Sequence, residues 1–233
     1  TTGLVYAIVQ TPLDTNADGD GDDLYLTMVE LNPASGVVNL YAVNYDKYVK
    51  NTNPNGFKAK KIKAGDLMYL GNGKFFMIEQ GSSEGGLVNN LVLIDLSNAT
   101  KLTAADYTGK ASLSAIAAVK TITPATRTLV ANLRDFGWLP EKAEGLAMID
   151  DQTIAIINDD DFGVAPKATC KVSGVSTALD PTKLTLNLKT QTLTTAEYTC
   201  DNGSISYTVV SNAEQERRTR LWIIKLSKKL STF

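Results

Sequence analysis

The sequence predicts an all-β protein that forms part of a β-propeller, and three observations support this fold class. Apolar segments of strand length alternate with clusters of Gly, Asn, Asp and Pro along the 233 residues. Helical periodicity is scarce, and the best helical candidate, 111–119, is short. Similar pairs of strands also recur at intervals of roughly 70 to 80 residues, which is typical of repeated antiparallel sheets.

The expected strands follow one another along the whole chain. In order they are 4–9, 24–31, 37–43, 66–70, 75–79, 90–96, 145–149, 153–157, 183–188, 205–210 and 220–226. The segments 4–10, 74–80 and 153–159 are apolar until they end in polar residues, and each has a later partner strand of similar pattern. Strands without a polar face suit sheets that are covered on both sides, as propeller blades are. The alternative interpretation is a β-sandwich with irregular strands.

The repeats give a domain organisation of about three blades within one partial propeller domain, 1–233. The last blade is interrupted by an insertion, 163–217. Propellers close with about four to eight blades, so about three blades would leave apolar faces open to water. We therefore expect a second polypeptide to complete the ring, such as the N-terminal half of a cleaved precursor. Association of two copies of this chain is the alternative.

Composition excludes several classes of function. The chain has no histidine, so Ser-His-Asp and Cys-His mechanisms cannot operate within it. It has 23 Lys and Arg against 25 Asp and Glu, which gives no cationic excess for nucleic acid. No apolar run approaches the roughly 18 to 20 residues that a membrane-spanning helix needs.

The two cysteines, Cys170 and Cys200, lie within the insertion. We expect them to form a structural disulfide, because their spacing is far from Cys-x-x-Cys and two ligands do not make a zinc site. A redox or metal-binding pair is the alternative. Two sequons, at Asn98 and Asn202, are candidate glycosylation sites and suit the same oxidising environment. The sequence therefore predicts a secreted protein, extracellular or periplasmic.

Acidic residues gather where the predicted strands end. If 145–149 and 153–157 pair as antiparallel neighbours, Glu144 and 158–161 fall at the same end of one blade. Glu79 occupies the equivalent strand end of the preceding blade. Hard cations prefer several such oxygen ligands, and a bound cation could polarise an ester. The candidate catalytic residues are Glu79, Glu144, Asp159 and Asp161, and the candidate metal ligands are Glu144 and Asp160. The alternative is that these acids cap turns.

A second acidic cluster spans 14–23, between two expected strands of one blade. Its opening matches the first half of an EF-hand loop, but Tyr25 stands at the twelfth position and no helices flank it. We therefore expect a calcium-binding hairpin loop, or alternatively a solvated acidic turn. Its candidate calcium ligands are Asp14, Asn16, Asp18, Asp20 and Asp22.

Two stretches resemble a known family. The run Glu-Gly-Leu-Ala at 144–147, followed by Asn-Asp-Asp-Asp-Phe-Gly at 158–163, resembles the "EGLA…NDNDFG" signature of phytase-like proteins, the esterase-like activity of phytase family. The segments 74–80 and 93–100 resemble its "RFLVLER…VDLSGAT" motif, with Gln80 in place of the motif's Arg. The resemblance implies a propeller fold, a correspondence to the C-terminal half of the family domain, and hydrolysis of phosphoesters or esters.

Two functional hypotheses follow from these observations. The first is a metal-assisted hydrolase of phosphoesters or esters that uses the acidic strand ends and calcium. The second is a non-catalytic propeller that binds a protein partner or a small ligand, in which calcium only braces loops. The absence of histidine and the change at Gln80 favour the second, and the family resemblance favours the first.

Overall fold

Strands dominate the computed structural model, which describes residues 3–13, 23–44, 62–83 and 86–233. The described residues form antiparallel sheets and few helices, so the all-β expectation is confirmed. The chain divides into two units, one formed by Thr1–Asp159 with Arg220–Phe233 and the other by Asp160–Thr219. Each unit is described on its own.

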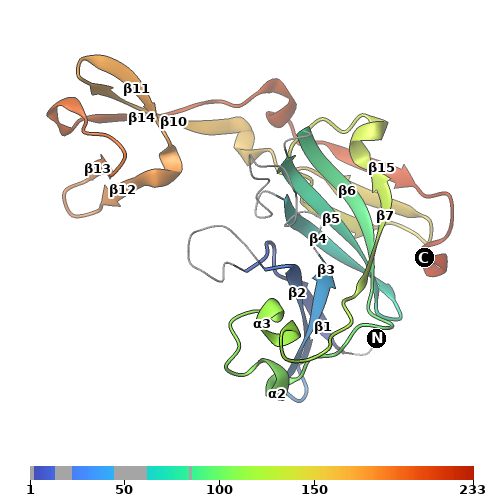
Figure 1. Cartoon of the computed structure of the whole chain (residues 1–233). Coiled ribbons are helices and arrows are strands. Elements are labelled where there is room, and N and C mark those ends of the chain that lie inside the picture. The colour runs from blue at the N-terminus through green and yellow to red at the C-terminus, as the bar shows by residue number, and fades with distance from the viewer. Residues whose placement is uncertain (1–2, 14–22, 45–61, 84–85) are drawn as a thin grey trace. The chain divides into compact units, whose positions relative to one another are not determined.

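The first unit contains three antiparallel sheets (Figure 1). The first consists of β1 (Val5–Ile8), β2 (Tyr25–Asn32) and β3 (Val37–Asn44). The second consists of β4 (Ile62–Gly71), β5 (Lys74–Ser83), β6 (Gly86–Asp95) and β7 (Thr126–Asn132). The third has the order β8 (Gly145–Met148), β9 (Thr153–Ile157) and β15 (Leu221–Lys225).

Successive sheets in this unit meet through their first strands, as propeller blades do. The Ala64 N–H at β4 donates to the Gln10 carbonyl just after β1, over 2.8 Å. Between β4 and β8, the Leu146 N–H donates to Asp66 Oδ2 over 2.7 Å. Gly65 lies so close to the segment just before β8 that a Cβ there would stand 2.3 Å from the Ala143 carbonyl oxygen. The sheets therefore have the arrangement of neighbouring blades.

Two apolar layers hold these sheets together. The layer between the first and second sheets includes Met28, Tyr41 and Phe75, and the layer between the second and third includes Phe76 and Trp138. Both faces of β5 are thus buried, which explains why its sequence is almost continuously apolar. Within the described residues, the outward face of the third sheet stays open, with Ile157, Leu221 and Ile223 exposed.

The connection from β6 to β7 forms two short helices, α2 (Ala104–Tyr107) and α3 (Leu113–Ala117). The expected helix at 111–119 is thus observed as α3, with Ser112 as its N-cap. Leu113 and Ile116 pack with Ala42 of β3, so this connection covers the outward face of the first sheet. A 3₁₀ turn, Leu133–Phe136, follows β7.

The second unit contains the two cysteines and has a small core of its own. Its elements are β10 (Val164–Val172), β11 (Val175–Leu179), β12 (Leu184–Asn187), β13 (Thr192–Thr195) and β14 (Ile205–Ser211). The strand β10 pairs with β11 and β14, and β12 pairs with β13. Cys170 and Cys200 form a disulfide, as the sequence predicts. Ala168, Cys170 and Leu179 are buried together.

Candidate functional site

The third sheet brings three separate segments together at one end. In the antiparallel register, β9 pairs with β8 at Gly145 and Ile157, and with β15 at Ile157 and Leu221. The residues next to these pairs, Glu144, Asn158 and Arg220, therefore lie side by side at this end of the sheet. The Glu144 N–H donates to the Ile157 carbonyl over 3.0 Å, and the Arg220 N–H donates to Asn158 Oδ1 over 2.5 Å.

We call this cluster the strand-end site and define it by Lys142, Glu144, Asn158, Asp159 and Arg220. Lys142 Nζ lies 3.1 Å from Asp159 Oδ2, and both side chains are more than a third exposed. Asn158 is buried, and the Nε–H of Arg220 is buried without a hydrogen-bond partner among the described residues. The site thus combines two carboxylates with two cations, and its charged groups face water in part.

The glycine next to Glu144 leaves room for the Ile157 side chain. A Cβ on Gly145 would lie 2.4 Å from Ile157 Cγ2 on the paired strand. Because real side chains do not approach so closely, the Glu-Gly pair of the sequence motif has a packing cause. The glycine lets β8 pair closely with β9, which fixes where Glu144 sits.

The second sheet holds Glu144 through a buried amide. Gln80 Nε2 donates to Glu144 Oε1 over 2.7 Å, while Gln80 Oε1 accepts from the Ala143 N–H. An Arg at this position has donors only and could not accept that N–H. The departure from the family motif at Gln80 therefore matches the bonds that this chain makes. A second buried amide, Asn89, donates to the Glu141 carbonyl over 2.7 Å.

Glu79 points to the opposite face of β5 from Gln80, because side chains alternate along a strand. Its side chain is fully buried and forms an ion pair with Arg127 of β7. Asn90 Nδ2 also donates to Glu79 Oε2, over 3.3 Å. The structure therefore places Glu79 between the first and second sheets, while Glu144 lies between the second and third.

Asp160 and Asp161 belong to the second unit. Asp160 Oδ1 accepts from the Phe162 N–H over 3.0 Å, and Asp160 Oδ2 accepts from the Thr219 hydroxyl over 2.6 Å. Asp161 is exposed and has a positive φ of 48°. Asp160 thus caps a turn, and the strand-end site contains Glu144 and Asp159 from the expected catalytic set.

The acids of the described residues do not gather into a metal site. In that part of the chain, no three His, Cys, Asp or Glu side chains are grouped so that they could hold a metal ion. The expected calcium ligands in the acidic loop, Asp14, Asn16, Asp18, Asp20 and Asp22, lie outside the described residues. Calcium binding there stays a prediction.

Three further observations concern the environment of the protein. The disulfide between Cys170 and Cys200 is compatible with an oxidising compartment. Asn98 and Asn202 are both exposed, and glycosylation at them stays a prediction. None of the helices in the described ranges has the length and apolar character that a membrane crossing requires.

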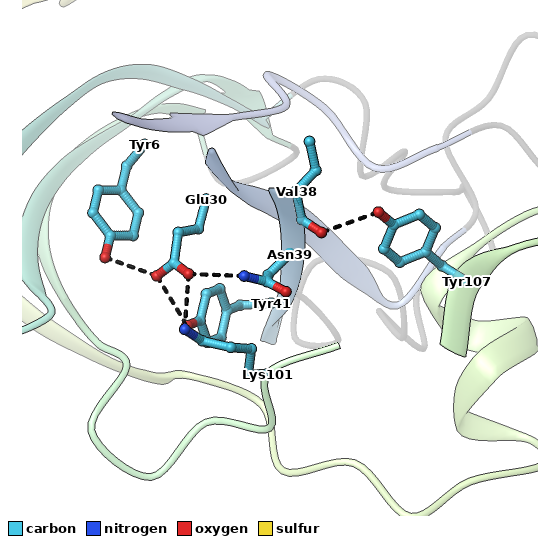
Figure 2. Close-up of polar contacts among 7 residues, drawn as sticks. All are labelled: Tyr6, Glu30, Val38, Asn39, Tyr41, Lys101 and Tyr107. Carbon is cyan, nitrogen blue, oxygen red and sulfur yellow. Dashed lines mark hydrogen bonds and ion pairs between the residues drawn. The ribbon is translucent and has the colours of Figure 1, made fainter. Parts of the chain in front are cut away.

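A second polar cluster surrounds Glu30 in the first sheet (Figure 2). Glu30 Oε1 accepts from Asn39 Nδ2 over 3.0 Å and from Lys101 Nζ over 2.8 Å. Glu30 Oε2 accepts from the hydroxyls of Tyr6 and Tyr41, over 2.8 and 3.2 Å. These donors come from both neighbouring strands and from the segment after β6, so no linear pattern in the sequence identifies them.

Burial and hydrogen bonding act in opposite directions on the pKa of Glu30. Burial alone would raise it, but the bonds from Lys101, Tyr6 and Asn39 outweigh burial, and the pKa lies below its usual value. Burial raises the pKa values of Tyr6 and Tyr41, which stay neutral donors. Because each oxygen of Glu30 already accepts two bonds, this cluster stabilises the first sheet and offers no free acceptor for a ligand.

The comparisons with known proteins agree with the motifs at the strand-end site. A family model described as Phytase-like, Esterase-like activity of phytase, matches residues 1–162. No curated protein and no solved structure matches significantly. The matched region includes the strand-end residues from Lys142 to Asp159 and ends close to Asp160, where the second unit begins. Because the match spans well over half of the chain, this protein belongs to the phytase-like family.

Proposed function

We propose that the protein is a secreted hydrolase of phosphoesters or carboxylic esters, and that it acts at the strand-end site. The observation that carries the proposal is the pairing of β8, β9 and β15, which gathers Lys142, Glu144, Asp159 and Arg220 at one sheet end. Membership of the phytase-like family supports an esterase-type reaction. The mixed charge of the site suits an anionic ester and a base beside it.

Each charged residue has a definite role in this proposal. Lys142 and Arg220 attract the negative charge of a phosphoester, or the charge that develops on the carbonyl oxygen of a carboxylic ester as water adds to it. Glu144 accepts a proton from a water molecule as the water oxygen bonds to the phosphorus or acyl carbon. The bond to the leaving oxygen then breaks, and this oxygen takes its proton from solvent. Gln80 holds the Glu144 carboxylate in place over 2.7 Å, and Asp159 orients Lys142.

In this proposal, calcium binds to the acidic loop. The acids in the described ranges do not form a group of three that could hold a metal ion, and the calcium ligands expected in the acidic loop lie outside these ranges. The composition of 14–22 suits calcium, which would brace the loop and, if it reached the ester, assist its hydrolysis.

The test is Glu144→Gln, which keeps the shape of the side chain and its contact with Gln80 but removes the base. We expect turnover of p-nitrophenyl phosphate or p-nitrophenyl acetate to fall by about 100-fold or more, because a positioned general base contributes that much. The matched control is Glu214→Gln, a carboxylate that is 73% exposed in the second unit.

Unchanged turnover in the Glu144→Gln variant, measured with equal folding by circular dichroism, would reject the role of Glu144. An equal loss in the Glu214→Gln control would show that the effect is not specific to the strand-end site. The assays are run with calcium and with a chelator, so that the contribution of the metal is measured separately.

A second candidate function is a non-catalytic propeller that binds a protein or a small ligand. The observation in its favour is that Glu144, Asp159 and Asp160 are each held by donors of the protein itself, as capping residues are. This candidate predicts no turnover on either ester with or without calcium, together with a melting temperature that falls when calcium is chelated.

A further inference from the structure

An apolar groove lies between the outer parts of the second and third sheets. Its volume is about 770 Å³. Residues of β6, β7, the turn after β7, β15 and the C-terminal segment line it, among them Leu91, Val130, Phe136, Trp222, Ile224 and Phe233. Phe136 is 72% exposed, so a large aromatic surface lies open to water at this groove.

The groove borders a strand edge that has no partner in the described part of the chain. The third sheet ends at β15, which pairs with β9 alone. Free N–H and C=O groups along a strand edge are a template for another strand. Because Trp222 and Ile224 of β15 pack toward the second sheet, a strand added beside β15 would continue the same layer over the groove.

The second sheet has a fourth strand, which has no counterpart in the third sheet among the described residues. It contains four strands, and β7 is its outermost. The third sheet has three strands among the described residues, so β7 faces the groove where a fourth strand would lie. The C-terminal segment does not fill this place, because the Phe233 ring packs on Phe76 and the Phe233 carbonyl accepts from Lys74 Nζ.

The charge at one end of the groove indicates the chemistry of the missing strand. Lys225 and Lys228 both line it, and no Asp or Glu of the described residues does. Lys225 ends β15, so a strand beside β15 would bring its own end close to these two cations. A carboxylate at that end would complement them.

We propose that a segment of a different protein, not a second copy of this chain, binds here as the fourth strand of the third sheet. It is extended, has apolar side chains at alternate positions that face the groove, and carries a carboxylate near Lys225 and Lys228. The volume alone would also suit a small ligand, since such sites occupy roughly 300 to 1,000 Å³. The edge of β15, which pairs with no second strand among the described residues, decides in favour of a strand.

The test uses the whole chain and a synthetic probe. The probe is a capped peptide of alternating Val and Thr with Glu at both ends. Calorimetry measures its affinity, and hydrogen–deuterium exchange follows the amides of 221–225. We expect saturable binding below about 1 mM, because short strands that add to a sheet edge bind through main-chain bonds. We also expect slower exchange within 221–225 when the peptide is bound.

Two matched controls separate strand addition from simple apolar contact. A peptide that is N-methylated at alternate residues keeps its side chains but loses the amide donors of one edge, and we expect its binding to be lost. The variant Phe136→Ser removes an exposed aromatic from the groove and should weaken binding about tenfold. Phe162→Ser changes a 97% exposed aromatic in the second unit and should leave binding unchanged.

Several outcomes would overturn the proposal. They are the absence of saturable binding, equal binding of the N-methylated peptide, and unchanged exchange within 221–225. Native mass spectrometry adds another, since a dimer of this chain that the probe peptide dissociates would identify the occupant as a second copy.

Discussion

Glu30 is a buried carboxylate whose charge is offset by the residues around it. It is 4% exposed, and its two oxygens accept bonds from two tyrosines, an asparagine and a lysine. Removing one member of such a network leaves the others with unsatisfied donors, which costs more than the lost bond itself. The stability of the first sheet should therefore depend on this one side chain.

The substitution Glu30→Gln tests this dependence. The amide of Gln presents an NH₂ group to donors that need an acceptor, so we expect the free energy of unfolding to fall by about 2 kcal/mol. Urea denaturation followed by circular dichroism measures it. Asp151→Asn is the matched control, because Asp151 forms an ion pair with Lys229 at 62% exposure, and we expect a much smaller loss since solvent screens such exposed pairs. Equal losses in the two variants would contradict the prediction.

The lowered pKa of Glu30 also predicts a pH dependence. An ordinary Glu titrates near pH 4.3. Because the folded state lowers this pKa, the carboxylate stabilises the fold above about pH 4.3, and the stabilisation is lost as the pH falls through the folded value. Other acids share this direction, including Asp106, whose pKa a hydrogen bond from Lys120 lowers to about 2. The measurement is therefore the difference between wild type and Glu30→Gln, which should shrink below pH 4.

At the scale of the elements, the strands of the disulfide-bonded insertion share only a small apolar core. Its buried residues are Ala168, Cys170 and Leu179, and its strands expose several apolar side chains. Such a small core depends on cross-links, because it cannot bury enough surface to offset the entropy of folding. The bond between Cys170 and Cys200, 30 residues apart, is therefore expected to supply much of its stability.

Replacing both cysteines with serine should destabilise this unit selectively. The chain-entropy estimate for a loop of this length is about 3 to 4 kcal/mol. We expect amides within 160–219 to exchange fast in the double variant, while amides of β5 and β6 keep their protection. Hydrogen–deuterium exchange distinguishes the two regions. Loss of protection in β5 would show that the first unit also depends on the bond.

The sequence predicts the strands better than it predicts which polar side chains bond to each other. The strands β8 and β9 follow from a local pattern, because a short polar turn joins two apolar runs and pairs them as a hairpin. The Glu79–Arg127 ion pair joins residues 48 apart, and the Glu30–Lys101 pair joins residues 71 apart. Neither pair belongs to a local motif, since each depends on how separate strands pack. Gln80, which differs from the family motif, is explained by its bonds to Glu144 and to the Ala143 N–H, and the sequence alone does not place these groups beside it.

At the scale of the whole molecule, the chain leaves the first unit and re-enters it at neighbouring points. Asn158 and Arg220 are hydrogen-bonded to each other at the end of the third sheet, and the second unit lies between them in sequence. The first unit thus contains its own strand pairs and apolar layers. The family match ends near the same boundary.

Replacing 160–218 with an Asn-Gly turn should therefore leave a folded first unit, because Asp159 and Thr219 then flank the turn in the register that pairs Ile157 with Leu221. The turn suits a short connection between antiparallel strands, and β9 and β15 keep their register. We expect the urea midpoint of the first unit to change little and any ester turnover to persist. A protein that fails to fold, judged by near-ultraviolet circular dichroism, would show that the first unit needs the insertion.

The position of β9 also affects how the protein is made. Its neighbour β8 leaves the ribosome just before it, but β15 follows only after the whole insertion, since Arg220 stands 62 residues beyond Asn158. During that delay one edge of a nascent apolar strand is unprotected. Folding of the insertion does not change this delay, but the pairing of Val164 with Ser211 brings the two ends of the insertion together. An early-folding insertion would thus lower the entropic cost of delivering the last strand.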